Sequence, residues 1–90
     1  MNSYSSANIE TMYRLLNGKI VAQEYIIKKE CDFTNIPLKD LPTKPNNLIA
    51  CIGRHRKIII PNGDDHLEAG DSVIVIAKEH TINDFKDILA

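Results

Sequence analysis

The fold of this chain is decided by the stretch IETMYRLLNGKIVAQEYI, residues 9–26. Its first half also fits a helical stripe, with apolar side chains at positions 9, 12, 13 and 16. Asn17-Gly18, however, is the strongest short-range signal of a β-hairpin, because both residues accept the positive φ angles of a type I′ turn. We therefore predict a hairpin over residues 9–28, with Asn17 and Gly18 as its two-residue loop.

This register sorts the side chains of the hairpin onto two faces. One face is mostly apolar and pairs Leu15 with Ile20, Tyr13 with Ala22, Thr11 with Glu24 and Ile9 with Ile26. The other face pairs Leu16 with Lys19, Arg14 with Val21, Met12 with Gln23 and Glu10 with Tyr25. Because this second face mixes polar and apolar side chains, we expect it to be half exposed to solvent.

After the hairpin, turn signals separate short apolar runs. Pro37 suits the first position of a short helix over residues 37–41, because a missing N–H costs nothing there. Residues 48–52, LIACI, are a continuous apolar run that is typical of a strand covered on both faces. Residues 57–61 and 72–77 predict two more strands, and Pro61 ends the first of these because it cannot donate to a ladder.

A last helix is predicted at the C-terminal end. Thr81 is its N-cap, and Asp84 at the third helical position completes a capping box. The apolar side chains of this helix form one stripe, made by Ile82, Phe85, Ile88 and Leu89. The predicted fold class is therefore α+β: an N-terminal hairpin, a short helix, three mostly antiparallel strands and a C-terminal helix, with about five strands in all.

Composition restricts the function classes. Ninety residues with 43% hydrophobic and 26% charged residues make one folded domain. A net charge of −1 gives little support for nucleic-acid binding. The longest apolar runs, residues 48–52 and 73–77, are far short of the roughly 20 residues that span a bilayer. No signal peptide is apparent, and Cys31 and Cys51 lack disulfide or zinc-site spacing, so we expect two reduced thiols and a cytoplasmic protein.

The sequence contains no enzyme signature that we could identify. It has no Gly-x-Ser-x-Gly elbow, no His-Glu-x-x-His motif and no phosphate loop, so we expect no catalytic residues. The glycines at 18, 53, 63 and 70 are too scattered for a dinucleotide fingerprint. A metal site is not expected either: His55, His66 and His80 lack ligand spacing, and the acidic residues between 64 and 71 are those that turns commonly use.

The most concentrated positive charge is the tetrad at residues 54–57, Arg-His-Arg-Lys, at a predicted hairpin tip. Two such tips that meet across a dimer would hold phosphates through bidentate guanidinium contacts. A solvated turn that keeps the sheet soluble is the alternative, and composition alone favours it.

Five segments, taken in order, resemble the TrkA C-terminal domain, the smaller lobe of RCK-type potassium regulators. They are LLNGKIVAQEYI (residues 15–26), PLKDL (37–41), LIACI (48–52), IIIPNGD (58–64) and LEAGDSVIV (67–75). The resemblance covers about residues 9–89, which makes residues 9–90 the domain and residues 1–8 a linker. It is closer to Trk potassium-uptake members than to channel-gating relatives.

The resemblance implies a regulatory, ligand-sensing domain on the cytoplasmic side of the membrane. In the family this lobe is attached to a Rossmann lobe that binds NAD and is absent here, so no cofactor is expected in this chain itself. The implied partners are a second copy, in a homodimer, and a TrkH-like membrane potassium-transport subunit. In some members the dimer cleft binds cyclic di-AMP. The implied ligand-binding residues are Arg54 and His55 for a phosphate, Ile59, Ile60 and Pro61 for adenine, and Asn62 for the edge of the base.

Two departures from the family pattern lie beside this cleft. Relatives often carry Asn-Gly where this chain has His55-Arg56, and non-glycine residues adopt positive φ only rarely, so we expect a longer turn or one of another type. Gly53 stands where relatives often have an aliphatic residue. The same domain also serves other hosts, such as cation antiporters, other transporters and transcription factors, and only the neighbouring domains distinguish these from a Trk system.

Overall fold

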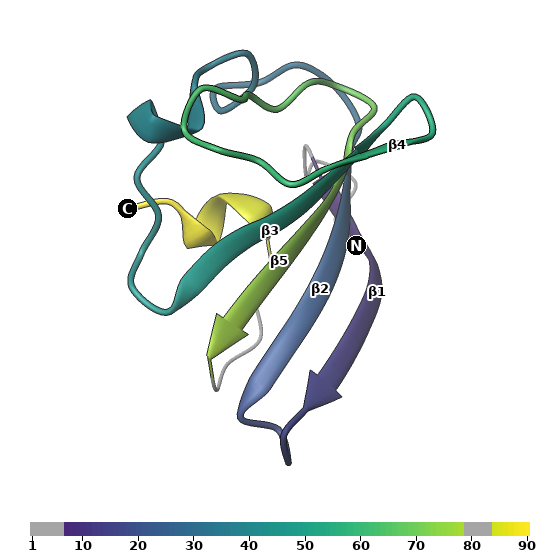
Figure 1. The fold of residues 1–90 in the computed structure, drawn as a ribbon, viewed down its shortest axis with the longest axis vertical. Helices are drawn as coiled ribbons and strands as arrows, with labels where there is room; N and C mark the ends of the chain where they lie inside the picture. Colours follow the sequence, from purple (N-terminus) through teal and green to yellow (C-terminus); the bar gives the residue numbers. More distant parts are fainter. Residues whose placement is uncertain (1–6, 79–83) are drawn as a thin grey trace.

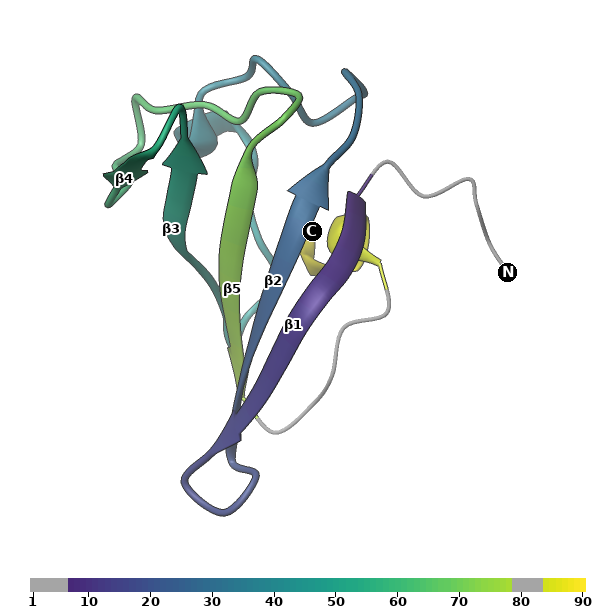
Figure 2. The ribbon, with the colours of Figure 1, turned by 90° about the vertical axis from the view of Figure 1, so that its right-hand side faces the viewer.

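A computed structural model describes residues 7–78 and 84–90. Its main element is a five-stranded antiparallel sheet in the order β1-β2-β5-β3-β4 (Figure 1). The strands are β1 (Ala7–Leu15), β2 (Ile20–Ile27), β3 (Asn47–Arg54), β4 (Lys57–Ile59) and β5 (Ser72–Lys78). Two 3₁₀ turns, η1 (Leu38–Asp40) and η2 (Phe85–Ile88), both lie behind the strands in Figure 2. The described connections therefore cover one face of the sheet.

The predicted N-terminal hairpin is confirmed. Asn17 and Gly18 have φ angles of 59° and 84°, and Gly18 N–H donates to the Leu15 carbonyl at 3.1 Å. Leu16 also has a positive φ, of 53°, so the left-handed segment is one residue longer than a two-residue I′ loop. Its strained backbone places the Leu16 side chain at the exposed tip.

The predicted register holds near the tip and fails at the far end. Leu15 pairs with Ile20 and Thr11 with Glu24, as expected, but a bulge between Ile9 and Thr11 shifts the rest. Ile9 consequently pairs with Tyr25 and not with Ile26. A bulge inserts one unpaired residue and strengthens the local twist, and alternation alone does not reveal it.

The faces of the hairpin are reversed relative to the expectation. The mixed face is the one that packs inward, with Val21, Gln23, Tyr25 and Ile27 all buried. The mostly apolar face points away, and Tyr13 and Leu15 on it are 64% and 50% exposed. Tertiary packing determines which face of the hairpin is covered. The chain that follows each hairpin crosses the sheet on the side where Tyr25 lies, so that side is buried and the other is exposed.

The covered face forms one hydrophobic core. Val73, Val75 and Ala77 of β5 alternate inward and pack with Ile27 and Ile52 from the flanking strands. Phe33, Leu67, Phe85 and Ile88 close the core from the connections and from η2. Phe85 stands edge-on to Tyr25, with ring centroids 5.6 Å apart, and lies 4.9 Å from Phe33. Burial raises the pKa of Tyr25, and the Asp84 and Asp87 carboxylates add to the shift.

The α+β expectation is wrong, because neither predicted helix forms among the described residues. Residues 37–41 contain only the three-residue turn η1, since a segment this short between two prolines cannot repay the cost of helix nucleation. At the C-terminal end η2 has four residues, and Asp84 before it is extended with φ −140°. Thr81 and Ile82 lie outside the described residues. The predicted strands, in contrast, correspond to β3, β4 and β5.

The hairpin tip yields a stability prediction. Gly18 has φ +84°, and no heavy atom lies within 4 Å of the point that a Cβ would occupy, so a side chain there is opposed by backbone strain and not by a clash. Gly18→Val should lower the free energy of unfolding by about 1–2 kcal/mol. Gly18→Asn is the matched control and should cost less than half of that, because Asn tolerates the left-handed region. Urea unfolding measures both, and equal costs would contradict the argument.

Candidate functional site

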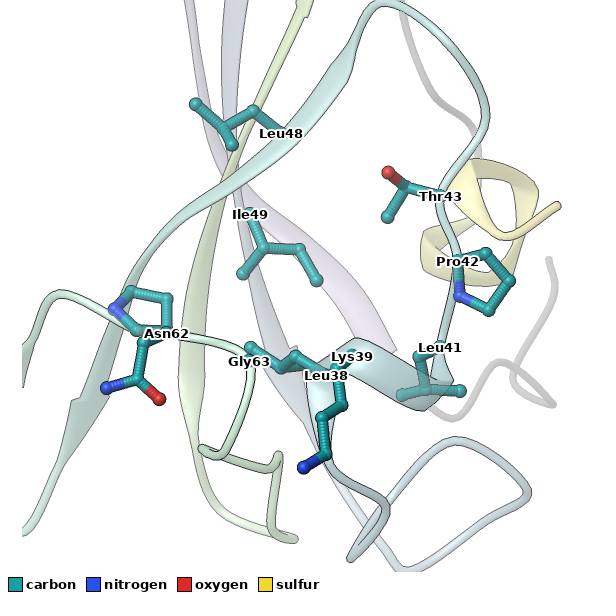
Figure 3. Close-up of a pocket in the computed structure, with 10 residues that line it drawn as sticks. Leu38, Lys39, Leu41, Pro42, Thr43, Leu48, Ile49, Asn62 and Gly63 are labelled. Atoms are coloured by element: carbon teal, nitrogen blue, oxygen red, sulfur yellow. The ribbon is translucent and has the colours of Figure 1, made fainter.

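A cavity of about 330 Å³ lies beside β3 (Figure 3). One of its sides is formed by η1 and the segment after it, and the other by the loop that follows β4. Leu38, Leu41 and Ile49 give it apolar walls and also pack against the core. The cavity is also lined by Pro61, Asn62 and Lys39. The cavity is therefore mostly apolar, with one ammonium group and one side-chain amide at its rim.

Backbone hydrogen bonds attach η1 to the loop at residues 62–65. Leu38 N–H donates to the Asp65 carbonyl at 2.8 Å, and Lys39 N–H donates to the Gly63 carbonyl at 3.0 Å. The two segments approach so closely that a Cβ on Gly63 would lie 3.1 Å from the Lys39 Cβ. A side chain at position 63 would therefore require η1 to shift by a few tenths of an ångström, although the φ of Gly63 is not positive.

The loop also fixes its own side chains. Asp64 N–H donates to Asn62 Oδ1 at 2.8 Å, and Asn62 N–H donates to Asp65 Oδ2 at 2.8 Å. With Oδ1 occupied in this way, the Asn62 amide NH₂ is the group that remains for a ligand. Lys39 Nζ lies 3.0 Å from Asp64 Oδ1, and the two side chains are 61% and 83% exposed. An exposed pair of this kind contributes little, so an incoming anion would displace Asp64 at small cost.

The structure brings only two of the six predicted ligand-binding residues into this cavity. Pro61 and Asn62 line it. Ile59 instead packs against the core, and Ile60 is 73% exposed without lining the cavity. The predicted set did not include Lys39 or the residues of η1 that also line this cavity. Their signal in the sequence is Pro37-Leu-Lys-Asp-Leu-Pro42, a short apolar turn between prolines.

Arg54 does not face the cavity but binds within its own chain. Its Nε and Nη2 donate to the two oxygens of Asp71 at 2.9 and 2.8 Å, and Nη2 also donates to the His66 carbonyl at 2.7 Å. Glu68 Oε2 lies 3.4 Å from Nη1. The hydrogen bonds to Asp71 raise the pKa of Arg54. This guanidinium is thus hydrogen-bonded within its own chain, and its contact with a phosphate stays a prediction.

His55 and Arg56 form the two-residue loop between β3 and β4, at a tip that projects from the body of the sheet (Figure 1). Their φ angles are 51° and 66°. The expectation of a longer or different turn is therefore wrong, and the loop adopts the left-handed conformation despite its two non-glycine residues. Both side chains are exposed. The tip and the cavity are separate features.

The described residues contain no group of three or more histidine, cysteine or acidic side chains that would hold a metal ion. No helix within residues 7–78 and 84–90 has the length and apolar character needed to cross a membrane. Among the acidic residues between 64 and 71, Asp65 accepts from Asn62 N–H and Asp71 accepts from Glu68 N–H, both at 2.8 Å.

The Arg54–Asp71 pair should be strongly stabilising as a unit, because the Asp71 side chain is only 1% exposed and the Arg54 side chain 20%. Arg54→Met should lower the free energy of unfolding by about 3 kcal/mol, since it leaves the buried Asp71 carboxylate without its cation. Asp71→Ala should cost less, because Arg54 is partly exposed and keeps Glu68 beside it. Lys39→Met breaks the exposed pair with Asp64 and should cost less than about 1 kcal/mol. Chemical denaturation tests this, and a small cost for Arg54→Met would free that residue for a ligand role.

Comparison with known proteins identifies the domain. The sequence model of the TrkA-C domain matches residues 22–90. Among curated proteins, "Trk system potassium uptake protein trkA homolog 1" of Methanosarcina mazei is 28% identical over 71 residues, which are 79% of this chain and 18% of that protein. Homolog 2 from a strain of the same organism is 27% identical over 71 residues and 16% of its length. The chain spans less than a fifth of the curated relatives that it matches. It belongs to the TrkA-C domain family.

Proposed function

We propose that this chain is a regulatory domain of a Trk-type potassium uptake system, that it senses a small ligand and dimerises, and that it performs no catalysis of its own. Membership of the TrkA-C family and the names of the relatives support the potassium-uptake role. In this proposal the domain acts at the cytoplasmic face of the membrane, as part of a longer protein that contacts a TrkH-like transport subunit. Any NAD belongs to another lobe of that protein.

The cavity beside β3 is the observation that carries the ligand-sensing part. Its volume of about 330 Å³ lies at the lower end of what small-molecule sites occupy. That is enough for a heterocyclic base but not for a whole dinucleotide. A base between Ile49 and Pro61 would gain apolar contact on both faces, and the Asn62 amide would donate to its edge. These groups select a planar, polar-edged ring.

Lys39 supplies the matching charge. A phosphate attached to such a base would reach the rim, where the Lys39 ammonium would exchange its exposed partner Asp64 for the ligand. Cyclic di-AMP is our specific proposal for the ligand. It has two identical halves, so two copies of this domain would each take one base and one phosphate through the same residues.

Binding would act on the junction between η1 and the 62–65 loop. The ligand would contact both segments, which two backbone hydrogen bonds already hold together. A ligand can shift a conformational equilibrium only through a difference in affinity for the two states. In this proposal the ligand has a higher affinity for the state in which η1 is closed against Pro61. The rest of the longer protein would transmit this closure to transport.

Calorimetry with cyclic di-AMP tests the proposed ligand and its site. The unaltered chain should bind, and Lys39→Gln should weaken binding by about 10- to 100-fold, the value of one charge-assisted contact. Asp64→Asn removes the competing carboxylate and should bind at least as tightly. Arg56→Gln, at the exposed tip, is the control and should bind normally. No heat and no thermal stabilisation with any variant would refute the ligand, while sensitivity to Arg56 alone would move the site to the tip.

Potassium uptake by cells that depend on the full-length protein tests the regulatory role. With Lys39→Gln in that protein, uptake should no longer respond to the cellular level of the ligand, because the domain cannot read it. Arg56→Gln should leave the response intact. If uptake is indifferent to deletion of the whole domain, the domain serves a different host.

A further inference from the structure

The tip of the β1–β2 hairpin gathers exposed apolar side chains. Four of the seven large apolar side chains that are exposed in the described structure lie there: Met12, Tyr13, Leu15 and Leu16. Leu16 is 72% exposed, and it belongs to the turn between the two strands. The hairpin extends past the neighbouring ends of β3 and β5 in both ribbon views, so its tip points away from the body of the domain (Figures 1 and 2). A protruding apolar cluster of this kind usually marks an interaction site.

The conformation of Leu16 carries a cost that the fold does not offset. Its φ of 53° lies in the left-handed region, which leucine rarely adopts, whereas the two residues that follow, Asn17 and Gly18, are types that accept it. A side chain that is 72% exposed gains little from packing. Backbone strain that packing does not explain is concentrated at sites of function. Leu16 is therefore better explained by a partner outside the domain than by the stability of the turn.

Positive charge accompanies these leucines. Arg14 precedes them and Lys19 ends the turn, and no acidic residue occurs in the sequence between Glu10 and Glu24. Arg14 and Lys19 are both exposed. Within the part of the chain that the structure describes, neither cation forms an ion pair. The tip thus offers apolar groups together with two unpaired cations, which suits a partner that carries negative charges over an apolar layer.

A membrane surface with anionic phospholipids has that composition. Arginine and lysine keep their charged ends among the headgroups while their apolar stems and neighbouring side chains lie deeper. Interfacial segments enter by roughly 5–10 Å. Tyr13 lies two residues, about 7 Å, behind Leu15 along β1, so its ring would reach the headgroups, where tyrosine is enriched. The carbonyls of Leu15 and Leu16 already accept backbone N–H groups within the turn, both at 3.1 Å, which lowers the cost of removing water from it.

The second hairpin tip, between β3 and β4, lacks this order of side chains. His55 and Arg56 form its loop, and the apolar Ile58 stands behind them along β4. An approach to a membrane would therefore place polar groups ahead of the apolar one. Ile58 is 73% exposed, nearly the same as Leu16, and Arg56 is exposed as Arg14 is. This tip consequently provides matched controls.

We infer that the β1–β2 tip is a contact site for the surface of an anionic phospholipid membrane. Leu15 and Leu16 enter the surface, and Arg14 and Lys19 contact the lipid phosphates. The inference goes beyond the proposed function and is independent of the cavity and its ligand. Two leucines bury less apolar surface than one acyl chain, whose anchoring alone is marginal, so the isolated tip binds weakly. In the longer protein the contact adds to any other attachment and orients the domain relative to the membrane.

Co-sedimentation of the 90-residue chain with vesicles tests the site. With phosphatidylcholine that contains about 30% phosphatidylserine, binding should rise over lipid concentrations up to about 5 mM. Vesicles of pure phosphatidylcholine should bind at least about 10-fold more weakly, because each of the two cations contributes roughly five-fold on an anionic surface.

Leu16→Asn separates membrane contact from folding. Asn tolerates the left-handed region, so this variant should keep or raise the free energy of unfolding in urea. It should nevertheless weaken vesicle binding at least about five-fold, because it removes apolar surface from the apex. Ile58→Thr is the matched control and should leave binding unchanged. Arg14→Gln and Lys19→Gln should each weaken binding about five-fold, whereas Arg56→Gln should not.

Absence of binding to the anionic vesicles would overturn the inference and leave an acidic protein surface as the partner to test. Equal losses from Leu16→Asn and Ile58→Thr would also overturn it, and so would binding that depends on charge and not on Leu16. Leu16→Asn should bind cyclic di-AMP as the unaltered chain does. Calorimetry with that ligand therefore distinguishes a failure of the proposed function from a failure of this inference.

Discussion

The buried carboxylate of Asp71 holds together the ends of three strands. Its side chain accepts two of the three Arg54 hydrogen bonds, at the end of β3, and also the Glu68 N–H of the turn before β5. The carbonyl of the same residue accepts Ile27 N–H at 2.9 Å, at the end of β2. One residue thus fixes where β2, β3 and β5 meet, and the rows of side chains on both faces of the sheet depend on that alignment. A carboxylate that is 1% exposed is tolerated there only because its cation is present.

Local signals in the sequence were sufficient for the strands and insufficient for the helices. Asn17-Gly18 marks a real turn and β4 ends shortly before Pro61, because each signal acts through backbone geometry or a missing donor that is independent of the rest of the fold. The stripe through Phe85 and Ile88 was correctly apolar, and both residues are buried. A 3₁₀ turn buries two residues three apart as well as a helix does, so periodicity over so short a segment does not distinguish the two.

Features that depend on tertiary contacts were assigned incorrectly or missed. No local pattern shows that Asp71, 17 positions away, accepts hydrogen bonds from the Arg54 guanidinium. The cavity required η1 and the 62–65 loop to meet, and nothing in either segment alone indicates the other. The covered face of the hairpin was likewise determined by where the connections cross, and not by which face carried more apolar side chains.

The irregularity of β3 gives one residue two environments. The register of this strand shifts between Ile49 and Cys51, and just before the shift Ile49 and Leu48 point to opposite sides of the strand, as Figure 3 shows. Leu48 lines the cavity, and it pairs with Ile76, whose neighbours Val75 and Ala77 are buried in the core. A ligand that contacted Leu48 would therefore touch a side chain on the side of β3 that faces away from the core. Any second molecule that contacted Leu48 there would be thermodynamically linked to the ligand: if one event changed the affinity for the other by some factor, the reverse effect would be the same factor.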